Sequence, residues 1–393
     1  MMPDLWSAGL SRRQAVRLLL SGTGMALLAA CGSAPAAGPT STAAQPQSPA
    51  SANGSATTAS AKTGAASSAP KPGGTLQIGT VTDITQLEGH RLQGQNFTML
   101  FPIFDRLTEY DDQLQPQPGL AESWEFSSDA KQLTLHLRKG VQYHTGRELT
   151  SDDVKFNILR VRDPKTGAAQ MVTMGNWWSD IRTPDASTVI LTSDQPRPAA
   201  FDFLEYLNIV DPVTLQGPKA QTTLVGTGPF KFVEWVTGDH LTLAKNPNYW
   251  QSGKPYLDQV TFRIGHDPQA VLTQLEARAL DAMDAPPIEE LAQLSRDAAY
   301  QVVKNAHPGG YTALLVNTAY PPLDKKEVRQ ALSYALDRQR YYQTVLKGNG
   351  AAQDLAWPSN SPAYEAAKND RYAFDLSKAK ALLASAGVTN TQF

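Results

Sequence analysis

Apolar and polar residues alternate with a period of two in five short stretches of the chain. This is the pattern of a half-buried β-strand, in which successive side chains point to opposite faces of a sheet. Five strands are therefore predicted around the following apolar sets: Leu76 and Ile78; Leu133, Leu135 and Leu137; Val189 and Leu191; Leu241 and Leu243; Val260, Phe262 and Ile264.

A helix is predicted after the second strand, because a capping signal precedes apolar residues at helical spacing. Thr150 is suited to the N-cap and Asp153 stands at the third helical position, which together form a capping box. Val154, Ile158 and Val161 then share one face of the helix.

Two more helices are predicted near the end of the sequence. Asp324 and Glu327 form a second capping-box pattern, followed at helical spacing by Val328, Ala331, Leu332, Ala335 and Leu336. Another helix is predicted to begin at Asp375, to end at Gly387, and to bury Leu376, Ala379, Leu382 and Leu383. Strands and helices interleave without a regular βαβ repeat, so we expect a mixed α/β (α+β) fold in several lobes.

The N-terminus is predicted to be an export signal. Two arginines, Arg12 and Arg13, precede a mostly apolar stretch over residues 16–30, which is short for a membrane span and typical of a signal peptide. Leu28-Ala29-Ala30-Cys31 resembles the lipobox of bacterial lipoproteins, in which the cysteine is lipidated. An unprocessed hydrophobic helix with a buried thiol is the alternative, and the arginine pair leaves Sec and Tat export both open.

Residues 31–71 are predicted to form a disordered tether behind this lipid anchor. Ala, Ser, Thr, Pro and Gly dominate the segment, and no charged residue occurs between Gly32 and Ala61. Such a composition offers too little apolar surface to compensate for the entropy lost on ordering.

Composition narrows the functional classes. Hydrophobic residues make up 41% of the 393 residues, charged residues 18%, and the formal net charge is -2, which gives no basic face for nucleic acid. The single cysteine excludes an intramolecular disulfide and a cysteine-rich zinc site. We expect no nucleic-acid partner.

No catalytic motif is recognisable in the sequence. Nucleophile-elbow, zinc-protease and phosphate-loop patterns are absent. His136 and His144 are too weak a pair to predict a metal site, and the carboxylate pairs at 111–112 and 152–153 are interpreted as a hairpin turn and a first helical turn. Residues 226–230 are interpreted as a turn that enters a strand. The prediction is a protein that is not an enzyme and needs no cofactor or metal.

Three groups of segments form a recognisable series along the chain. The first is 118–126 (PGLAESWEF), 133–141 (LTLHLRKGV) and 143–154 (YHTGRELTSDDV); the second is 226–232 (GTGPFKF), 241–243 (LTL) and 246–250 (NPNYW); the third is 316–318 (VNT), 321–324 (PPLD) and 328–338 (VRQALSYALDR). In order and spacing these segments closely resemble the family-5 extracellular solute-binding proteins, which serve oligopeptide, dipeptide and nickel ABC importers.

The resemblance implies a bilobal periplasmic-binding-protein-like fold of the large three-domain type, with a ligand cleft that closes between the lobes. The implied organisation is a signal peptide over 1–30, domain I over 72–110 and 221–286, domain II over 111–220, and domain III over 287–393. Family members continue far beyond the helix that ends at Gly387. The second lobe is therefore expected to be incomplete in this sequence, with unpaired strand edges, poor stability and a tendency to aggregate. A smaller departure is Arg278, where the family usually has glycine.

Candidate ligand-binding residues are aromatic and amide side chains in predicted loops and edges. Aromatic rings bind peptides and sugars at low entropic cost, whereas core packing or helix capping is the alternative for each of them. The candidates are Trp177, Trp178, Trp357, Tyr311, Asn317, Asn96 and Gln95, with Tyr311 and Asn317 placed on the first strand of domain III.

The hypothesis from the sequence is a lipid-anchored, extracytoplasmic binder of oligopeptides or dipeptides, anchored at the outer face of the cell membrane through Cys31. Its expected partners are the permease and ATPase subunits of an ABC importer. Binding of an oligosaccharide or a nickel chelate on the same fold, a sensor role, and an extracytoplasmic hydrolase remain the alternatives.

Overall fold

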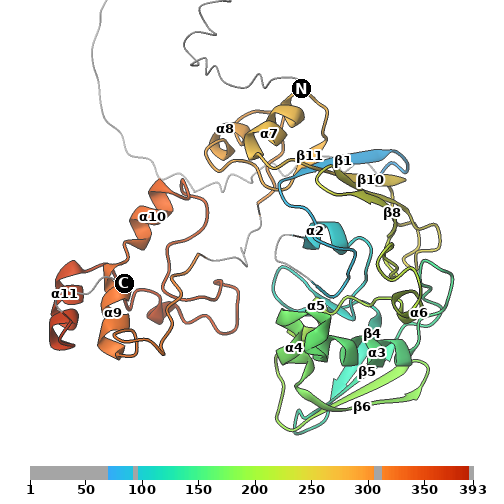
Figure 1. Cartoon of the computed structure of the whole chain (residues 1–393), viewed down its shortest axis with the longest axis horizontal. Coiled ribbons are helices and arrows are strands. Elements are labelled where there is room, and N and C mark those ends of the chain that lie inside the picture. Colours follow the sequence, from blue (N-terminus) through green and yellow to red (C-terminus); the bar gives the residue numbers. More distant parts are fainter. Residues whose placement is uncertain (1–69, 92–95, 305–311, 389–393) are drawn as a thin grey trace, which may run out of the picture. The chain divides into compact units, whose positions relative to one another are not determined.

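The computed structural model describes residues 70–91, 96–304 and 312–388 and shows a mixed α/β fold with several sheets (Figure 1). The strands are β1 (Thr75–Thr80), β2 (Thr108–Tyr110), β3 (Pro116–Pro118), β4 (Ala121–Phe126), β5 (Gln132–Leu137), β6 (Trp178–Asp185), β7 (Thr188–Ser193), β8 (Phe230–Val236), β9 (His240–Lys245), β10 (Gln259–Ile264) and β11 (Ala282–Met283). The helices are α2 (Phe97–Leu100), α3 (Ser151–Arg162), α4 (Ala169–Gly175), α5 (Ala200–Tyr206), α6 (Pro212–Gln216), α7 (Pro268–Glu276), α8 (Leu291–Leu294), α9 (Lys326–Ala335), α10 (Arg338–Thr344) and α11 (Leu376–Ser385), with short 3-10 turns at Pro164–Thr166 and Ala366–Lys368.

A five-stranded sheet joins two distant parts of the chain, in the order β11-β1-β10-β9-β8. β1 runs parallel to both β10 and β11, with Ile78 opposite Phe262 and Ala282, whereas β8, β9 and β10 are antiparallel neighbours. α7 packs on β1, and Gly79 gives it room, since a Cβ there would lie 2.4 Å from the Val271 side chain. The small residue in β1 therefore allows helix and sheet to approach closely.

A second sheet has four antiparallel strands in the order β4-β5-β7-β6. Along β5, Leu133, Leu135 and Leu137 are buried and the residues between them, His136 included, are partly exposed. α3 covers this sheet and contributes Val154, Ile158 and Val161 to the same apolar cluster. The apolar residues that recur every two positions in the strand and every 3.6 positions in the helix thus pack in one core.

All five predicted strands are present, as β1, β5, β7, β9 and β10. The predicted helix after Thr150 is confirmed as α3: the Thr150 N–H donates to Asp153 Oδ2 at 2.8 Å, and the Thr150 hydroxyl donates to the same oxygen at 3.1 Å. The helix predicted from Asp375 is confirmed as α11, where the Asp375 carboxylate accepts the Lys378 N–H at 2.9 Å and Gly387 has a φ of +70°.

The start of α9 differs from the prediction. The helix begins at Lys326 and Lys325 occupies the N-cap without a side-chain capping bond, so the expected cap at Asp324 is wrong. The reason is a preceding turn in which the Asp324 N–H donates to the Tyr320 carbonyl oxygen. This bond keeps Asp324 in the turn, one residue ahead of the N-cap.

Fewer residues of the C-terminal helices are buried than the sequence pattern predicted. In α9 and α11, which pack against each other, only Val328, Ala331 and Ala379 are buried, whereas Leu376 is 50% exposed. Ala335 and Leu336 at the end of α9 are exposed as well. Leu376 is the first residue of α11, so no helical turn precedes it, and its exposure corrects its expected place in the core.

The strand predicted for Asn317 is also corrected, whereas Tyr311, predicted for the same strand, lies outside the described residues. Residues 312–317 form no strand and pair with none of the strands in the described ranges. Leu314 and Leu315, which would alternate in such a strand, are 57% and 88% exposed. A strand needs a neighbouring backbone to satisfy its N–H and C=O groups, and alternation alone does not supply it.

The three interpretations of residues 111–112, 152–153 and 226–230 as turns are confirmed. Asp111 lies in the turn between β2 and β3, where its N–H donates to the Gln115 carbonyl oxygen, and Asp153 lies in the first turn of α3. Residues 226–229 lead into β8.

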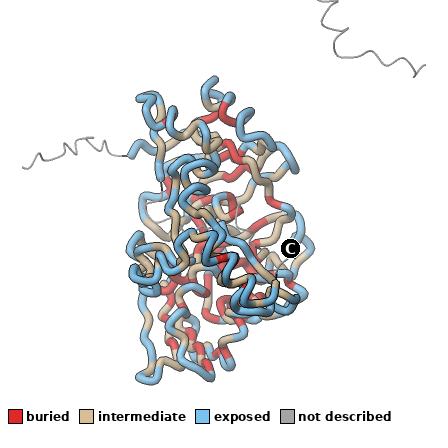
Figure 2. The backbone as a smooth tube through the Cα atoms, turned by 90° about the vertical axis from the view of Figure 1, so that its left-hand side faces the viewer, coloured by how far each residue is buried: buried red, intermediate tan, exposed pale blue. Residues whose placement is uncertain are grey.

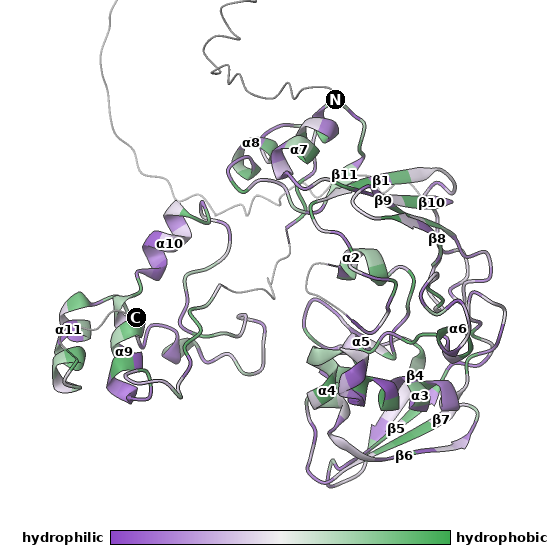
Figure 3. Ribbon diagram, viewed as in Figure 1, coloured by the Kyte–Doolittle hydropathy of each residue, from purple (hydrophilic) through white to green (hydrophobic). Residues whose placement is uncertain are grey.

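The tube coloured by burial alternates between buried and exposed stretches throughout (Figure 2). Hydropathy distinguishes the last helices, because α10 is largely hydrophilic while α11 carries more apolar residues (Figure 3).

Candidate functional site

The carboxyl ends of three parallel strands meet at one edge of the five-stranded sheet. The chain leaves β1 after Thr80, β10 after Ile264 and β11 after Met283. The Asp284 N–H donates to the Gly79 carbonyl oxygen at 3.1 Å, which holds the residue after β11 beside the end of β1. Ligands of open sheets with parallel strands bind outside this edge.

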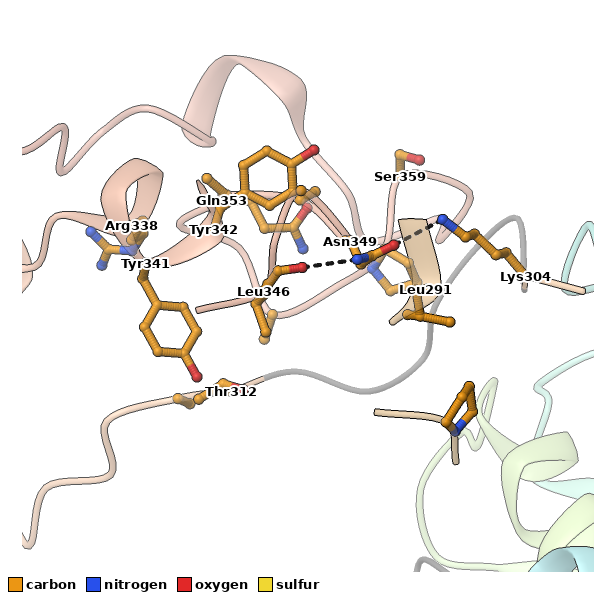
Figure 4. Close-up of a pocket in the computed structure, with 18 of the residues that line it drawn as sticks. Leu291, Lys304, Thr312, Arg338, Tyr341, Tyr342, Leu346, Asn349, Gln353 and Ser359 are labelled. Atoms are coloured by element: carbon orange, nitrogen blue, oxygen red, sulfur yellow. Dashed lines mark hydrogen bonds between the residues drawn. The ribbon is translucent and has the colours of Figure 1, made fainter. Parts of the chain in front are cut away.

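A cavity of about 1730 Å³ is lined by residues from this edge. Its lining comes from two stretches of the described chain, within 275–304 and 312–359, and includes Asp281 and Asp284. Leu291 and Lys304 from the first stretch and Thr312 from the second are labelled in Figure 4. Pockets for small molecules usually measure about 300–1,000 Å³. The volume is therefore sufficient for a solute larger than a single amino acid.

Aromatic and aliphatic side chains form much of the lining. α10 contributes Tyr341 and Tyr342, and Leu346 follows in the next turn (Figure 4). A tyrosine combines an apolar ring with a hydroxyl group, so it can pack on a ligand and also hydrogen-bond to it. Tyr341 is 39% exposed, which leaves its ring available.

Most charged groups of the lining are held by partners within the protein. Arg338 Nη1 lies 3.1 Å from Asp354 Oδ1 and donates to the Ser333 carbonyl oxygen at 3.0 Å. Lys304 Nζ donates to Asn349 Oδ1 at 2.8 Å, and the Asn349 amide donates to the Leu346 carbonyl oxygen (Figure 4). These bonds fix the side chains in place before any solute binds.

Asp284 differs from these groups in its surroundings. It is exposed at the strand edge, yet the protein atoms around it raise the pKa of its carboxyl above the ordinary value, mainly by desolvation, with a hydrogen bond from Thr80 acting in the opposite direction. Thr80 itself is buried.

The two adjacent tryptophans proposed for the ligand have different surroundings. Trp178 is the first residue of β6, is 1% exposed and packs near Phe203, with ring centroids 6.3 Å apart. It is a core residue with no surface left for a ligand, which corrects its expected role. Trp177 is partly buried against the same apolar cluster, and the Arg197 guanidinium lies 5.3 Å from its ring centroid.

Trp357 and Asn317 lie in loops. Trp357 is 50% exposed and its carbonyl oxygen accepts a bond from Gln353, a residue of the cavity lining. Asn317 is exposed, and its side-chain oxygen accepts the Ala319 N–H at 3.0 Å, which closes a turn. Neither residue is part of the cavity lining, although Ala356 and Pro358 on both sides of Trp357 are.

Asn96 is 6% exposed and occupies the N-cap position of α2, but its side chain makes no capping hydrogen bond there. Gln95, Tyr311 and Cys31, which were predicted for ligand binding and lipidation, lie outside the described residues. The predicted set is therefore not brought together into one site by the structure.

The sequence prediction missed Tyr341, Tyr342 and Asp284. The adjacent tyrosines could have been recognised in the sequence as candidates for ligand binding, because they are two aromatic residues shortly after the end of a predicted helix. Asp284 had no such signal, since its position depends on the pairing of β11 with β1.

The two histidines considered for metal binding form hydrogen bonds within the protein. His136 Nε2 lies 3.2 Å from Glu125 Oε1, and His144 Nε2 donates to the Gly228 carbonyl oxygen at 3.0 Å. Burial lowers the pKa of His144 to about 4. Within residues 70–91, 96–304 and 312–388, no group of three or more His, Cys, Asp or Glu side chains is placed to hold a metal ion.

Among the helices in those same ranges, we found none that combines the length and the apolar character required to cross a bilayer.

Comparison with known proteins places these features in context. Residues 115–393 match the family described as "Bacterial extracellular solute-binding proteins, family 5 Middle". Heme-binding protein A of Haemophilus influenzae is 31% identical over 73% of this chain, and the dipeptide-binding protein of Escherichia coli is 30% identical over 73%. The chain spans 57% and 58% of the length of these two relatives.

Solved structures agree with the fold. The periplasmic binding protein AgaA of A. tumefaciens R10, in complex with agropinic acid, superimposes with a TM-score of 0.72 at 34% identity, over 80% of this chain and 64% of that one. The periplasmic binding protein DppA of Helicobacter pylori, in complex with the peptide STSA, gives a TM-score of 0.70 at 25% identity, over 81% and 67%. The fold is thus that of periplasmic binding proteins.

Proposed function

This chain belongs to family 5 of the bacterial extracellular solute-binding proteins, and we propose that it captures dipeptides or oligopeptides for an ABC importer. The observation that carries the proposal is the cavity at the carboxyl edge of β1 and β11, in a chain of this family. Its relatives include a dipeptide-binding protein and a peptide complex, which favour a peptide among the possible solutes.

The cavity chemistry supports a peptide ligand. An extended peptide has apolar side chains that pack on tyrosine and leucine, and polar backbone groups that need hydrogen-bond partners. The cavity lining provides apolar surface from Tyr341, Tyr342 and Leu346 for such side chains. It also provides polar atoms from Asn349 and Ser359 for the peptide backbone. Closure of the lobes around the bound peptide would remove it from water and present one surface to the permease. No covalent chemistry is assigned to the protein.

We propose further that the mature protein is anchored outside the cytoplasmic membrane by lipidation of Cys31. The support is the sequence Leu28-Ala29-Ala30-Cys31 at the end of an apolar stretch, together with membership of an extracellular family. Metabolic labelling with radioactive palmitate tests it: the wild-type protein should be labelled and the Cys31→Ser variant should not. Labelling of both proteins, or of neither, contradicts the anchor.

Thermal unfolding in the presence of candidate solutes tests the function. A ligand that binds only the folded protein stabilises it by about 2.7 kcal/mol at one hundred times its Kd, and Tm rises accordingly. Mixed dipeptide and tripeptide pools should raise Tm, whereas cello-oligosaccharides and nickel with free histidine serve as comparison arms. A shift with an oligosaccharide or the nickel complex and none with any peptide pool refutes the peptide proposal. Hydrolysis of a bound peptide would refute the absence of catalysis.

A further inference from the structure

A second, smaller pocket lies beside the turn that follows β5, and it shares none of its described lining residues with the large cavity. It measures about 330 Å³, at the lower end of the range of about 300–1,000 Å³ that is usual for small ligands. Its lining consists of Glu122, Arg138, Lys139, Val141 and Trp250. Charged groups therefore dominate this pocket, whereas aromatic and aliphatic side chains form much of the large cavity.

Arg138 is held in a fixed position at this pocket. Its backbone N–H donates to the Leu120 carbonyl oxygen at 2.9 Å, and its Nε donates to the Gly119 carbonyl oxygen at 2.8 Å. The guanidinium carbon lies 4.8 Å from the ring centroid of Trp250, whose indole N–H donates to Asp105 at 2.9 Å. The side chain thus uses one of its five N–H donors for the fold, and those on Nη1 and Nη2 remain available to a ligand.

The positive charges of this pocket have no carboxylate partner in the described protein. Within residues 70–91, 96–304 and 312–388, no ion pair involves Arg138, Lys139 or Glu122, although all three line the same pocket. The carboxylate of Glu148, on the next segment of the chain, accepts the Gly140 N–H at 3.0 Å. Two cations therefore outnumber the single carboxylate of the lining, and the excess positive charge attracts an anion.

We propose that this pocket binds a phosphate group, carried by a free phosphate ester or by a phospholipid head group. The guanidinium of Arg138 presents paired N–H donors that match two oxygens of a phosphate, and the Lys139 ammonium adds a second positive charge. A phosphate monoester carries a charge of about −1.5 to −2 at pH 7, which matches two cations better than the single charge of a carboxylate does. The site is independent of the large cavity and of the peptide proposed for it.

Isothermal titration of the full chain with inorganic phosphate tests the site, with a sodium chloride titration at equal ionic strength to correct for screening. Lys139→Gln removes an attractive charge and Glu122→Gln removes a repulsive one. Lys219→Gln is the matched control, because Lys219 is exposed in the turn after α6 and lies outside the pocket lining. All three positions are exposed, so each variant should fold, and thermal unfolding without phosphate verifies this.

Wild-type protein and Lys219→Gln should bind phosphate with the same Kd. Lys139→Gln should raise Kd about fivefold and Glu122→Gln should lower it about threefold, because the two exposed charges act on the anion in opposite directions. Arg138→Lys should raise Kd about tenfold, since an ammonium keeps the charge but not the paired donors. Absence of phosphate binding by folded wild-type protein overturns the proposal, and so do equal Kd values for Lys139→Gln, Glu122→Gln and Lys219→Gln.

Two phosphate esters distinguish the source of the phosphate group. Glycerol 3-phosphate represents a free ester, and a water-soluble short-chain phosphatidic acid adds acyl groups to the same phosphate. A lower Kd for the phosphatidic acid indicates a lipid head group, because acyl groups then contact the apolar part of the lining at Val141 and Trp250. Equal Kd values indicate a free phosphate ester, and both results support the phosphate site.

Discussion

At the scale of single residues, Arg147 compensates two buried carboxylates. Its guanidinium donates to Asp153 at 2.9 and 3.0 Å and to Asp211 at 2.7 and 3.1 Å, and it stacks on the ring of Tyr143 at 4.5 Å. The side chains of Asp153 and Asp211 are 9% and 1% exposed. In the folded protein neither carboxylate is exposed enough to be well solvated by water, so both depend on the arginine for their opposite charge.

Arg147→Met should therefore destabilise the protein by about 3–5 kcal/mol, because it leaves two buried negative charges without their partner. Arg182 pairs with Asp180 at the surface, where both side chains are more than half exposed, so Arg182→Met should cost at most about 1 kcal/mol. Urea unfolding at neutral pH measures both values. Equal effects of the two substitutions would contradict the compensating role of Arg147.

At the scale of elements, the loop 226–229 shows how closely the backbone segments approach. A Cβ on Gly228 would lie 2.6 and 2.7 Å from backbone atoms of Ile103, and one on Gly226 would lie 2.3 Å from the Ile103 carbonyl oxygen. Between them, the buried Thr227 hydroxyl donates to Asp105 at 2.9 Å. Burial raises the pKa of Asp105, whose carboxylate also accepts bonds from Tyr249 and Trp250.

We expect Gly228→Ala to destabilise the protein by about 1–3 kcal/mol, because the methyl group meets backbone that cannot rotate away. The control is Thr222→Ala, an exposed position a few residues earlier, where the change should be within about 0.5 kcal/mol. Chemical unfolding monitored by tryptophan fluorescence gives both numbers. Wild-type stability in Gly228→Ala would show that the loop can move apart from Ile103.

The elements also show where prediction from sequence ends. The strand pattern around Leu133 to Leu137 and the cap at Thr150 were predicted correctly, because each depends on neighbours within a few residues. Trp177 and Trp178 could not be distinguished in the same way. Successive residues of a strand face opposite sides, so their burial depends on where β6 begins, and it begins at Trp178.

At the scale of the whole molecule, the buried His90 and the half-buried His144 tie stability to pH. His90 Nε2 donates to the Asn208 carbonyl oxygen, while its Nδ1 accepts a bond from Arg160 Nη1 at 2.7 Å, which requires a neutral ring. Burial and the charge of Arg160 lower the pKa of His90 to about 4, and burial lowers that of His144 to about 4.

Since these folded-state pKa values lie below that of an unfolded histidine, near 6.5, the unfolded chain takes up protons first as the pH falls. Each histidine should then reduce the free energy of unfolding by up to about 1.4 kcal/mol per pH unit between pH 6.5 and 4. Urea unfolding at several pH values should show a smaller loss in His90→Gln and His144→Gln than in the wild type.

Strand and helix positions, the turns at 111 and 226–229, and the resemblance to a solute-binding family were all determined by the sequence itself, because alternation, capping and turn chemistry act between close neighbours. The tertiary structure alone decided which carboxylates line the cavity. Gln77 and Asp281, 204 residues apart, are joined by a hydrogen bond where β1 and β11 align, and Asp284 reaches the strand edge only through that pairing. Parallel strands pair across long separations, and nothing local in the sequence specifies which partner each will find.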